Sequence, residues 1–201
     1  DVNDFAVGVL FAVDSGAAVV QEALGSVNNT PLSREAIDYA WRNNVTVVAS
    51  AADEDSYHHN FPGTNDHAMY VHAIVYDTED IEESTTTFLN FNNCTNYGAQ
   101  LVLSTSGSSC SSEATGMTSG IVGLLYSAAL QADLDAPPAA DAATDLYGAR
   151  RLTHDEVRSL LQATAYDIDV PEKEWEELGT YPSGPGWDQR FGYGVLWHAR
   201  H

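Results

Sequence analysis

The chain has 201 residues, long enough to bury one sizeable core, so we predict a single domain over residues 1–201. Eight Lys and Arg against 29 Asp and Glu give a net charge of −21, which repels a phosphate backbone and excludes nucleic acid as a favoured partner. No apolar run approaches the roughly 20 residues that span a bilayer, so we expect no association with membranes.

Helices and strands are expected to alternate near the start of the chain. Residues 4–16 carry apolar side chains at helical spacing up to Gly16, which predicts a helix and its stop. The run "AAVVQEAL", residues 17–24, predicts a strand. In "TPLSREAIDYAWRNN", Thr30 as N-cap and Pro31 at the first helical position predict a second helix. The continuous apolar run "VTVVASAA", residues 45–52, predicts a strand buried on both faces.

The rest of the chain continues this alternation. A helix is expected after Ser112, and the capping box from Thr153 to Glu156 predicts another. Residues 134–151 are rich in Ala, Pro and Asp and lack periodicity, which predicts a surface loop. Further strands are expected at residues 69–77, 85–93 and 100–106.

Strands that alternate with helices predict an α/β fold with a mostly parallel sheet covered on both faces. Ligands of such open sheets bind outside the carboxyl ends of the strands. The segments at those ends lie near Gly25, Asp53 and Ser112, so we expect three polar loops to converge there. A serine at a helix N-terminus either caps the helix or serves as a nucleophile in acyl transfer.

Several motifs, in a fixed order, resemble the subtilisin-like serine proteases, the subtilases. "VTVVASAADED" is similar to the family's strand ending in Ala-Gly-Asn, "FPG" at residues 61–63 to its Tyr-Pro-Gly, and "CTNYG" to its Ser-Asn-Tyr-Gly. "SSEATGMTSG" resembles the nucleophile motif, with Ser112 at the reactive serine. A register that places Thr115 there instead loses the matches at Ala114 and Gly120. The resemblance covers nearly the whole chain.

The resemblance extends to the C-terminal half to two-thirds of the subtilase catalytic domain. It implies an α/β, subtilisin-like three-layer fold with helices on both faces of a mostly parallel sheet, lacking its N-terminal part. It also implies a serine endopeptidase in which Ser112 is the nucleophile. The Asp and His of the triad would come from a missing or separate N-terminal half, because the family's Asp and His precede the segment that resembles residue 1. His58 and His59 follow the matching segments and are weaker candidates for the base.

The resemblance also implies a substrate cleft for a polypeptide. Asp53 is a departure, because it occupies the place of the family's oxyanion-hole Asn, and an ionised carboxylate accepts hydrogen bonds but does not donate them. A protonated Asp53 would still donate one. The residues expected to line the cleft are Ala23, Leu24 and Gly25 on one side and Ala49, Ser50, Ala51 and Ala52, up to Asp53, on the other.

The degenerate serine motif and Asp53 leave a second hypothesis open, a catalytically inactive pseudoprotease that acts as a binding or structural module. Cys94 and Cys110 are the only cysteines, and the resemblance places them at the two ends of the segment that leads to Ser112, which predicts a disulfide. A disulfide favours a secreted protein, extracellular or periplasmic. We expect no cofactor and no metal site.

Overall fold

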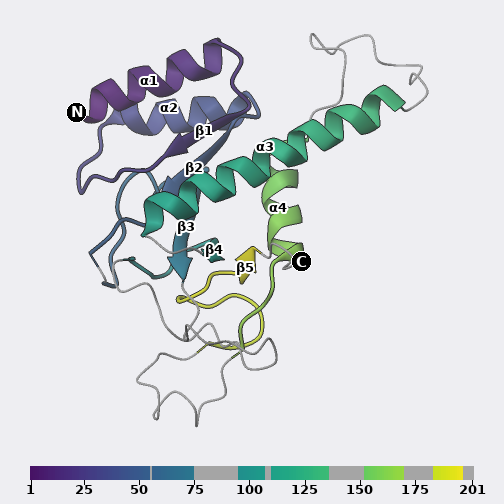
Figure 1. Cartoon of the computed structure of the whole chain (residues 1–201). Helices are drawn as coiled ribbons and strands as arrows, with labels where there is room; N and C mark the ends of the chain where they lie inside the picture. Colours follow the sequence, from purple (N-terminus) through teal and green to yellow (C-terminus); the bar gives the residue numbers. More distant parts are fainter. Residues whose placement is uncertain (55, 75–94, 107–109, 136–151, 170–182, 197–201) are drawn as a thin grey trace.

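A computed structural model of the chain describes residues 1–54, 56–74, 95–106, 110–135, 152–169 and 183–196. Its centre is a five-stranded sheet in which every strand is parallel to its neighbours, in the order β1-β2-β3-β4-β5 (Figure 1). The strands are β1 (Val19–Glu22), β2 (Thr46–Ser50), β3 (Ala68–Ile74), β4 (Leu103–Ser106) and β5 (Val195–Leu196). Strand order in the sheet follows chain order.

Helices cover both faces of the sheet, which confirms the predicted α/β architecture. The helices are α1 (Val2–Asp14), α2 (Pro31–Arg42), α3 (Ser111–Asp135) and α4 (His154–Thr164). Alternate residues of β2 point to opposite faces: Val47 packs in the core under α1 and α2, and Val48 packs in the core with residues of α3 and α4. None of the described helices is both long and apolar enough to cross a membrane.

The predicted helix starts of α2 and α4 are confirmed. Thr30 accepts a hydrogen bond from the backbone N–H of Ser33 at 3.1 Å, and Thr153 accepts one from that of Glu156 at 3.1 Å. Each cap satisfies an N–H that has no acceptor inside its own helix.

Most element bounds differ by a few residues from the sequence-based expectation, and those at the two ends of α3 differ as follows. Helix α3 begins at Ser111, one residue before Ser112, and it continues through Asp135. The predicted start of the loop, residue 134, is therefore two residues too early, because the helix includes residues 134 and 135. The physical reason is that the first helix breaker after this run is Pro137, so nothing in the sequence ends the helix at residue 134. Residues 136–151 and the strand expected at 85–93 lie outside the described residues.

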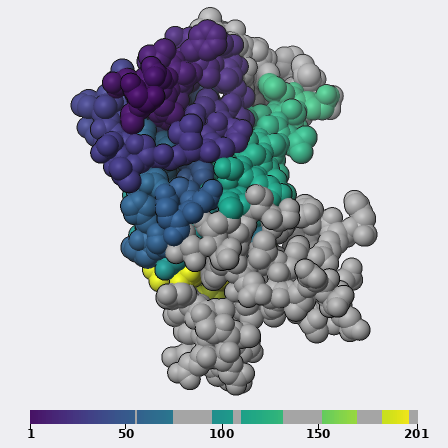
Figure 2. Space-filling view, turned by 60° about the vertical axis from the view of Figure 1, so that its left-hand side comes forward, coloured from purple at the N-terminus to yellow at the C-terminus, as the bar shows by residue number. Residues whose placement is uncertain are grey.

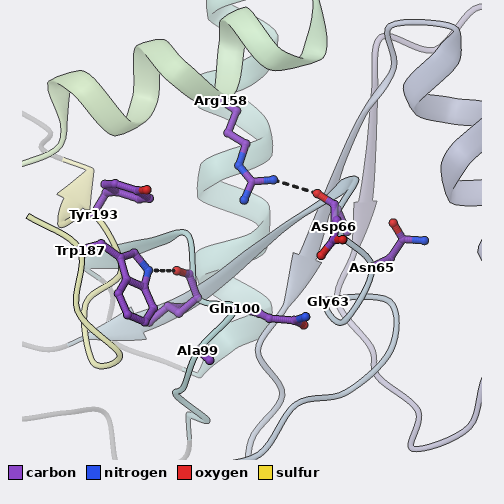
Figure 3. Close-up of a pocket in the computed structure, with 10 residues that line it drawn as sticks. Gly63, Asn65, Asp66, Ala99, Gln100, Arg158, Trp187 and Tyr193 are labelled. Carbon is purple, nitrogen blue, oxygen red and sulfur yellow. Dashed lines mark hydrogen bonds between the residues drawn. The ribbon is translucent and has the colours of Figure 1, made fainter.

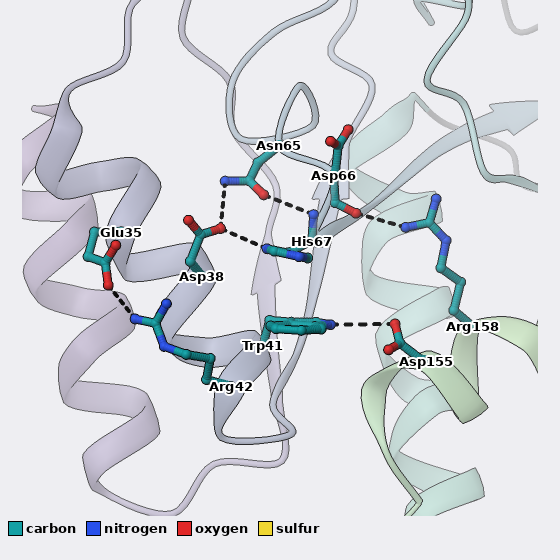
Figure 4. A network of polar contacts seen from close by, with 9 residues as sticks. All are labelled: Glu35, Asp38, Trp41, Arg42, Asn65, Asp66, His67, Asp155 and Arg158. Carbon is teal, nitrogen blue, oxygen red and sulfur yellow. Dashed lines mark hydrogen bonds and ion pairs between the residues drawn. The ribbon is translucent and has the colours of Figure 1, made fainter.

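A polar network ties α2 to the turn before β3 and to the first turn of α4 (Figure 4). The carboxylate of Asp38 lies 2.8 Å from Nδ1 of His67, whose ring stacks on Trp41 with 4.2 Å between ring centroids. The Trp41 indole N–H donates to Asp155 at 3.4 Å. This network joins elements on the two faces of the sheet at the amino ends of its strands, away from the carboxyl ends.

Candidate active site

Three polar segments converge at the carboxyl ends of β1 and β2, as the sequence predicts. Ser112 is the second residue of α3, and its exposed hydroxyl donates to the carbonyl oxygen of Ala23 at 3.4 Å. Ala23 follows β1 directly, and Asp53 follows β2 after two residues. The N–H of Ser112 is among the first four of the helix, which lack acceptors within the helix and lie at the positive end of its dipole.

Asp53 is joined to the start of α3 through Ser111. Its Oδ1 accepts a hydrogen bond from the backbone N–H of Ser111 at 3.0 Å and a second from the Ser111 hydroxyl at 2.5 Å. The hydroxyls of Ser50 and Ser111 lie 2.6 Å apart, and the backbone N–H of Ala52 donates to Ser50 Oγ at 3.0 Å. Since the Ser111 proton goes to Asp53, the proton between the two hydroxyls comes from Ser50.

These hydrogen bonds give one oxygen of the Asp53 carboxyl group, Oδ1, the role of an acceptor. Oδ1 accepts from the Ser111 N–H at the N-terminus of a 25-residue helix, and so it caps an N–H that has no acceptor within the helix. Sequence reasoning found Asp53 but not its anchor. Ser111 is buried. In the sequence, only its place in the motif "SSEATGMTSG" indicated that it belongs to the site.

Asn96 organises the loop that follows Asp53 and is a residue to which sequence reasoning gave no role. Its Oδ1 accepts from the backbone N–H groups of Glu54 at 3.1 Å and Ser56 at 3.2 Å. Its backbone N–H donates to the carbonyl of Ala52 at 2.9 Å. Ala52 has a φ of 65°, a left-handed conformation that favours glycine. Asn96 belongs to the "CTNYG" motif, so its place in that motif could have identified it as a residue of the site.

The described histidines contact groups other than Ser112. His59 packs against the rings of Tyr57 and Tyr70, at centroid distances of 5.4 and 5.9 Å, and burial lowers the pKa of its imidazole. His72 is fully buried in β3, with Nδ1 3.2 Å from the Asn96 carbonyl, and desolvation lowers its pKa to about 3. Within the described residues, the hydrogen bond of the Ser112 hydroxyl goes to a carbonyl and not to an imidazole.

Comparison with known proteins identifies the family. The sequence profile of the subtilase family matches residues 3–194. The chain belongs to the subtilase family of serine proteases. It is 30% identical to Thermitase of Thermoactinomyces vulgaris over 132 residues, 60% of this chain and 44% of that protein. It is also 30% identical to a Thermophilic serine proteinase of Bacillus sp. (strain AK1) over 89 residues, 44% of this chain and 21% of that protein.

Solved structures agree with the fold. Sphericase superimposes with a TM-score of 0.68 at 20% identity, over 97% of this chain and 63% of its own. The prenylagaramide maturation protease PagA superimposes with a TM-score of 0.68 at 16% identity, over 98% of this chain and 64% of its own. The subtilase chain thus spans less than half of the curated relatives and less than two thirds of these structures.

The residues expected to line the subtilase cleft divide into exposed and buried groups. Leu24 is 57% exposed, and Ala23 and Gly25 beside it are exposed too. On the other side, Ala52 is partly exposed and Asp53 is exposed. The remaining three, Ala49, Ser50 and Ala51, are buried within or directly after β2. Ser50 acts on the site through Ser111, while Ala49 packs in the core under α1 and α2.

Helix α3, which begins with Ser111 and Ser112, lies beside the N-terminal elements of the chain. In Figure 2 the teal helix lies at the surface beside the purple and blue N-terminal segments. Gly116 and Gly120, one turn apart, have open space where a Cβ would point, and Leu124 is 71% exposed. This face of α3 is therefore available for further contacts.

Cys110 precedes α3 directly and is disulfide-bonded. Its expected partner, Cys94, lies outside the described residues, so the Cys94–Cys110 pairing stays a prediction. A covalent bond at Cys110 restrains the segment that leads to Ser111 and Ser112.

A separate cavity of about 340 Å³ opens at the amino ends of β3 and β4, away from the candidate active site (Figure 3). The guanidinium of Arg158 donates to the carbonyl of Asp66 at 2.9 Å on one side, and the Trp187 indole donates to the Leu101 carbonyl at 2.8 Å on another. Across the described parts of the chain, no group of three or more His, Cys, Asp or Glu is placed to hold a metal ion.

Proposed function

We propose that this chain is the nucleophile-bearing part of a serine endopeptidase, with Ser112 as the nucleophile. The observation that carries the proposal is the position of Ser112 at the N-terminus of α3, with its hydroxyl directed across the sheet edge to Ala23. Family membership supplies the reaction class, the hydrolysis of peptide bonds in polypeptides.

The proposed chemistry follows from this geometry. The Ser112 Oγ attacks the carbonyl carbon of the scissile bond while its proton passes to a histidine, and the histidine then gives that proton to the leaving amine. The oxyanion accepts a hydrogen bond from the Ser112 N–H at the helix start. In the free protein the hydroxyl proton points to the Ala23 carbonyl, so the base must draw it away.

We propose that the histidine and its partner aspartate come from polypeptide outside these 201 residues. Two observations support this. The described contacts of Ser112 include no imidazole, and the chain covers only 63% of the Sphericase structure and 44% of Thermitase. The partner would be an N-terminal subtilase half, in the same or a separate chain.

The substrate is proposed to lie extended between two walls. Ala23, Leu24 and Gly25 are exposed beside Ser112 and would pair with the substrate backbone as an added strand, while Ala52 and Asp53 would form the facing wall. The disulfide at Cys110 supports a secreted location, extracellular or periplasmic.

The test is covalent labelling of the protein expressed from its complete gene with a fluorophosphonate probe. We expect labelling at Ser112, located by mass spectrometry, and hydrolysis of casein. Ser112→Ala should abolish both, and Ser127→Ala, an exposed serine on the same helix, should change neither. Equal labelling of the wild-type and Ser112→Ala proteins would refute the nucleophile assignment.

One observation favours a second function, a pseudoprotease that binds peptides without cleaving them. Residue 53 is an aspartate whose Oδ1 accepts both hydrogen bonds from Ser111, and its other oxygen, Oδ2, stands where an asparagine would present an NH₂ donor to the oxyanion. A complete protein that binds an extended peptide but neither labels nor hydrolyses would support this function over the endopeptidase.

A further inference from the structure

The cavity at the amino ends of β3 and β4 is lined by polar and aromatic side chains that the proposed function does not use. Its volume of about 340 Å³ is at the lower end of the range for small-molecule sites. In Figure 3, Arg158 reaches the cavity from α4 at the top, the rings of Trp187 and Tyr193 lie on the left, and Gln100 extends along the bottom. The cavity and Ser112 lie at opposite ends of the strands, so a ligand here is separate from the proposed substrate cleft.

Arg158 carries the only cationic side chain among the described residues that line the cavity. It is half-buried, and one N–H of its guanidinium donates to the backbone carbonyl of Asp66 at 2.9 Å. It forms no ion pair with a carboxylate of the described residues, although the chain has 29 acidic side chains and only eight of Lys and Arg. The other N–H groups of a guanidinium form a planar fork that matches the two oxygens of a carboxylate.

Gln100 and the two aromatic rings add a hydrogen-bond acceptor and an apolar surface. Gln100 Oε1 is buried and has no hydrogen-bond partner within the described part of the chain, and a buried acceptor left unpaired is costly, so an N–H group on a ligand is favoured there. Trp187 is 41% exposed and Tyr193 is 40% exposed. The Trp187 indole is held in place by its 2.8 Å hydrogen bond to the Leu101 carbonyl.

The charges around the cavity disfavour two other classes of ligand. A metal cation would be repelled by the guanidinium of Arg158, and the described residues bring together no group of three or more His, Cys, Asp or Glu to hold one. A polyphosphate needs several cationic groups, and the net charge of −21 repels it at long range. A single carboxylate is the anion that one guanidinium neutralises.

We infer that this cavity binds a monocarboxylate joined to an aromatic or apolar group. The carboxylate pairs with Arg158, and the apolar group lies against Trp187 and Tyr193. This chemistry occurs in the C-terminal residue of a peptide and in free aromatic acids. In the peptide, the amide N–H of the last residue also donates to Gln100 Oε1.

The experiment measures binding to the protein expressed from its complete gene, by isothermal titration calorimetry in 1 M NaCl, which screens the long-range repulsion. The probe is N-acetylphenylalanine, and N-acetylphenylalaninamide, which lacks the carboxylate, is its matched control. We expect saturable binding of the acid and at least about tenfold weaker binding of the amide. Arg158→Gln should weaken binding of the acid by at least about tenfold. Arg34→Gln, an exposed arginine that does not line the cavity, should leave it unchanged.

A third probe, 3-phenylpropionate, has the same ring and carboxylate without the N–H, and so it separates the two sources. Tighter binding of N-acetylphenylalanine, lost in Gln100→Met, would support the inference with a peptide C-terminus as the ligand. Equal binding would support it with a free aromatic acid.

The inference would be overturned by no saturable binding of either acid, or by equal binding of N-acetylphenylalanine and its amide. Equal binding of the acid to the wild type and to a folded Arg158→Gln protein would overturn it too, and circular dichroism establishes the folding. If that variant does not fold, the comparison of acid with amide on the wild type decides. None of these outcomes bears on Ser112 as the nucleophile.

Discussion

Ser111 binds Asp53 twice, through its backbone N–H at 3.0 Å and through its hydroxyl, and both hydrogen bonds end on the same oxygen, Oδ1. The second carboxyl oxygen, Oδ2, takes no hydrogen bond from any residue in the described parts of the chain. This is the atom that an asparagine would replace with an NH₂ group. The anchoring of residue 53 and its effect on an oxyanion are therefore properties of two different atoms.

The substitution Asp53→Asn should raise the activity of the complete protein. The asparagine Oδ1 accepts both bonds from Ser111 as before, while its NH₂ group becomes a donor to the oxyanion. One such donor changes kcat by on the order of 10². The measurement is kcat on a good peptide substrate, normalised by fluorophosphonate titration.

Asp53→Ala is the matched control, because it removes both the anchor and the possibility of a donor. It should lower the free energy of unfolding by about 1 kcal/mol, the usual effect of losing a helix cap. A tenfold or greater loss of activity in Asp53→Asn would show instead that the carboxyl group itself is needed.

Ala52→Gly should stabilise the protein by about 0.5 to 1 kcal/mol. The left-handed φ of 65° costs an alanine about 1 to 2 kcal/mol, partly offset because glycine loses more backbone entropy on folding. Urea unfolding measures the difference. The adjacent Ala51→Gly has no positive φ to relieve and should destabilise. A loss of stability in Ala52→Gly would contradict the strain argument.

Reduction of the disulfide at Cys110 should destabilise the segment that leads to α3. If Cys94 is the partner, the closed loop has about 17 residues, and the chain-entropy model gives about 3 kcal/mol. Cys110→Ser and Cys94→Ser should then lower the melting temperature equally, and the double variant no further. Unequal shifts, or a Cys94-containing peptide found as a free thiol by non-reducing mass spectrometry, would disprove the pairing.

Most of the fold was predictable because its signals are local. The Thr30 and Thr153 caps and the mostly apolar, fully buried β2 each depend on residues that are close together in sequence. The predicted end of α3 was wrong because the change in composition at residue 134 indicated a loop. A helix continues until it reaches a helix-breaking residue, and α3 continues through Asp135. Composition alone therefore gave the wrong boundary.

The candidate site was predictable in its residues but not in its contacts. The motifs located Ser112 and Asp53, yet the role of Ser111 depends on which oxygen of Asp53 it binds, a contact between residues 58 apart. Gly25 packs against Asn60, which no motif singled out, beside the backbone pairing of Ser26 with Phe61. Such contacts between distant residues have no periodic signature in a sequence.

Acid should destabilise the protein through buried histidines. His154 is 1% exposed, and desolvation lowers its pKa to about 4 from an ordinary 6.5. Between these values the unfolded chain binds a proton that the folded chain does not, so the free energy of unfolding falls as the pH drops below 6.5. His154→Gln should reduce the loss between pH 7 and pH 5 by about 1 to 2 kcal/mol. Urea unfolding of both proteins at the two pH values tests this, and an unchanged difference would exclude His154 as a source of acid sensitivity.

The 201-residue chain by itself should not hydrolyse peptides and should label slowly, if at all, with a fluorophosphonate. The physical reason is that a serine hydroxyl is a weak nucleophile at neutral pH unless a base activates it, and the Ser112 hydroxyl donates to a carbonyl that does not serve as one. Addition of the preceding part of the complete gene product, as a separate chain or in fusion, should restore labelling at Ser112. Ser112→Ala in the same combination should stay unlabelled.

The outcome that would contradict this expectation is rapid labelling of the isolated chain, because a histidine within it would then have to act as the base. His58 and His59 are the nearest along the chain to Asp53, and they are testable one at a time as His58→Gln and His59→Gln. The contacts of His59 with Tyr57 and Tyr70 argue against it, since an imidazole packed between two rings is held by them and not by a serine. Labelling that survives in both variants would locate the base elsewhere in these residues, whereas loss of labelling in one variant would identify it and refute a triad assembled from two parts.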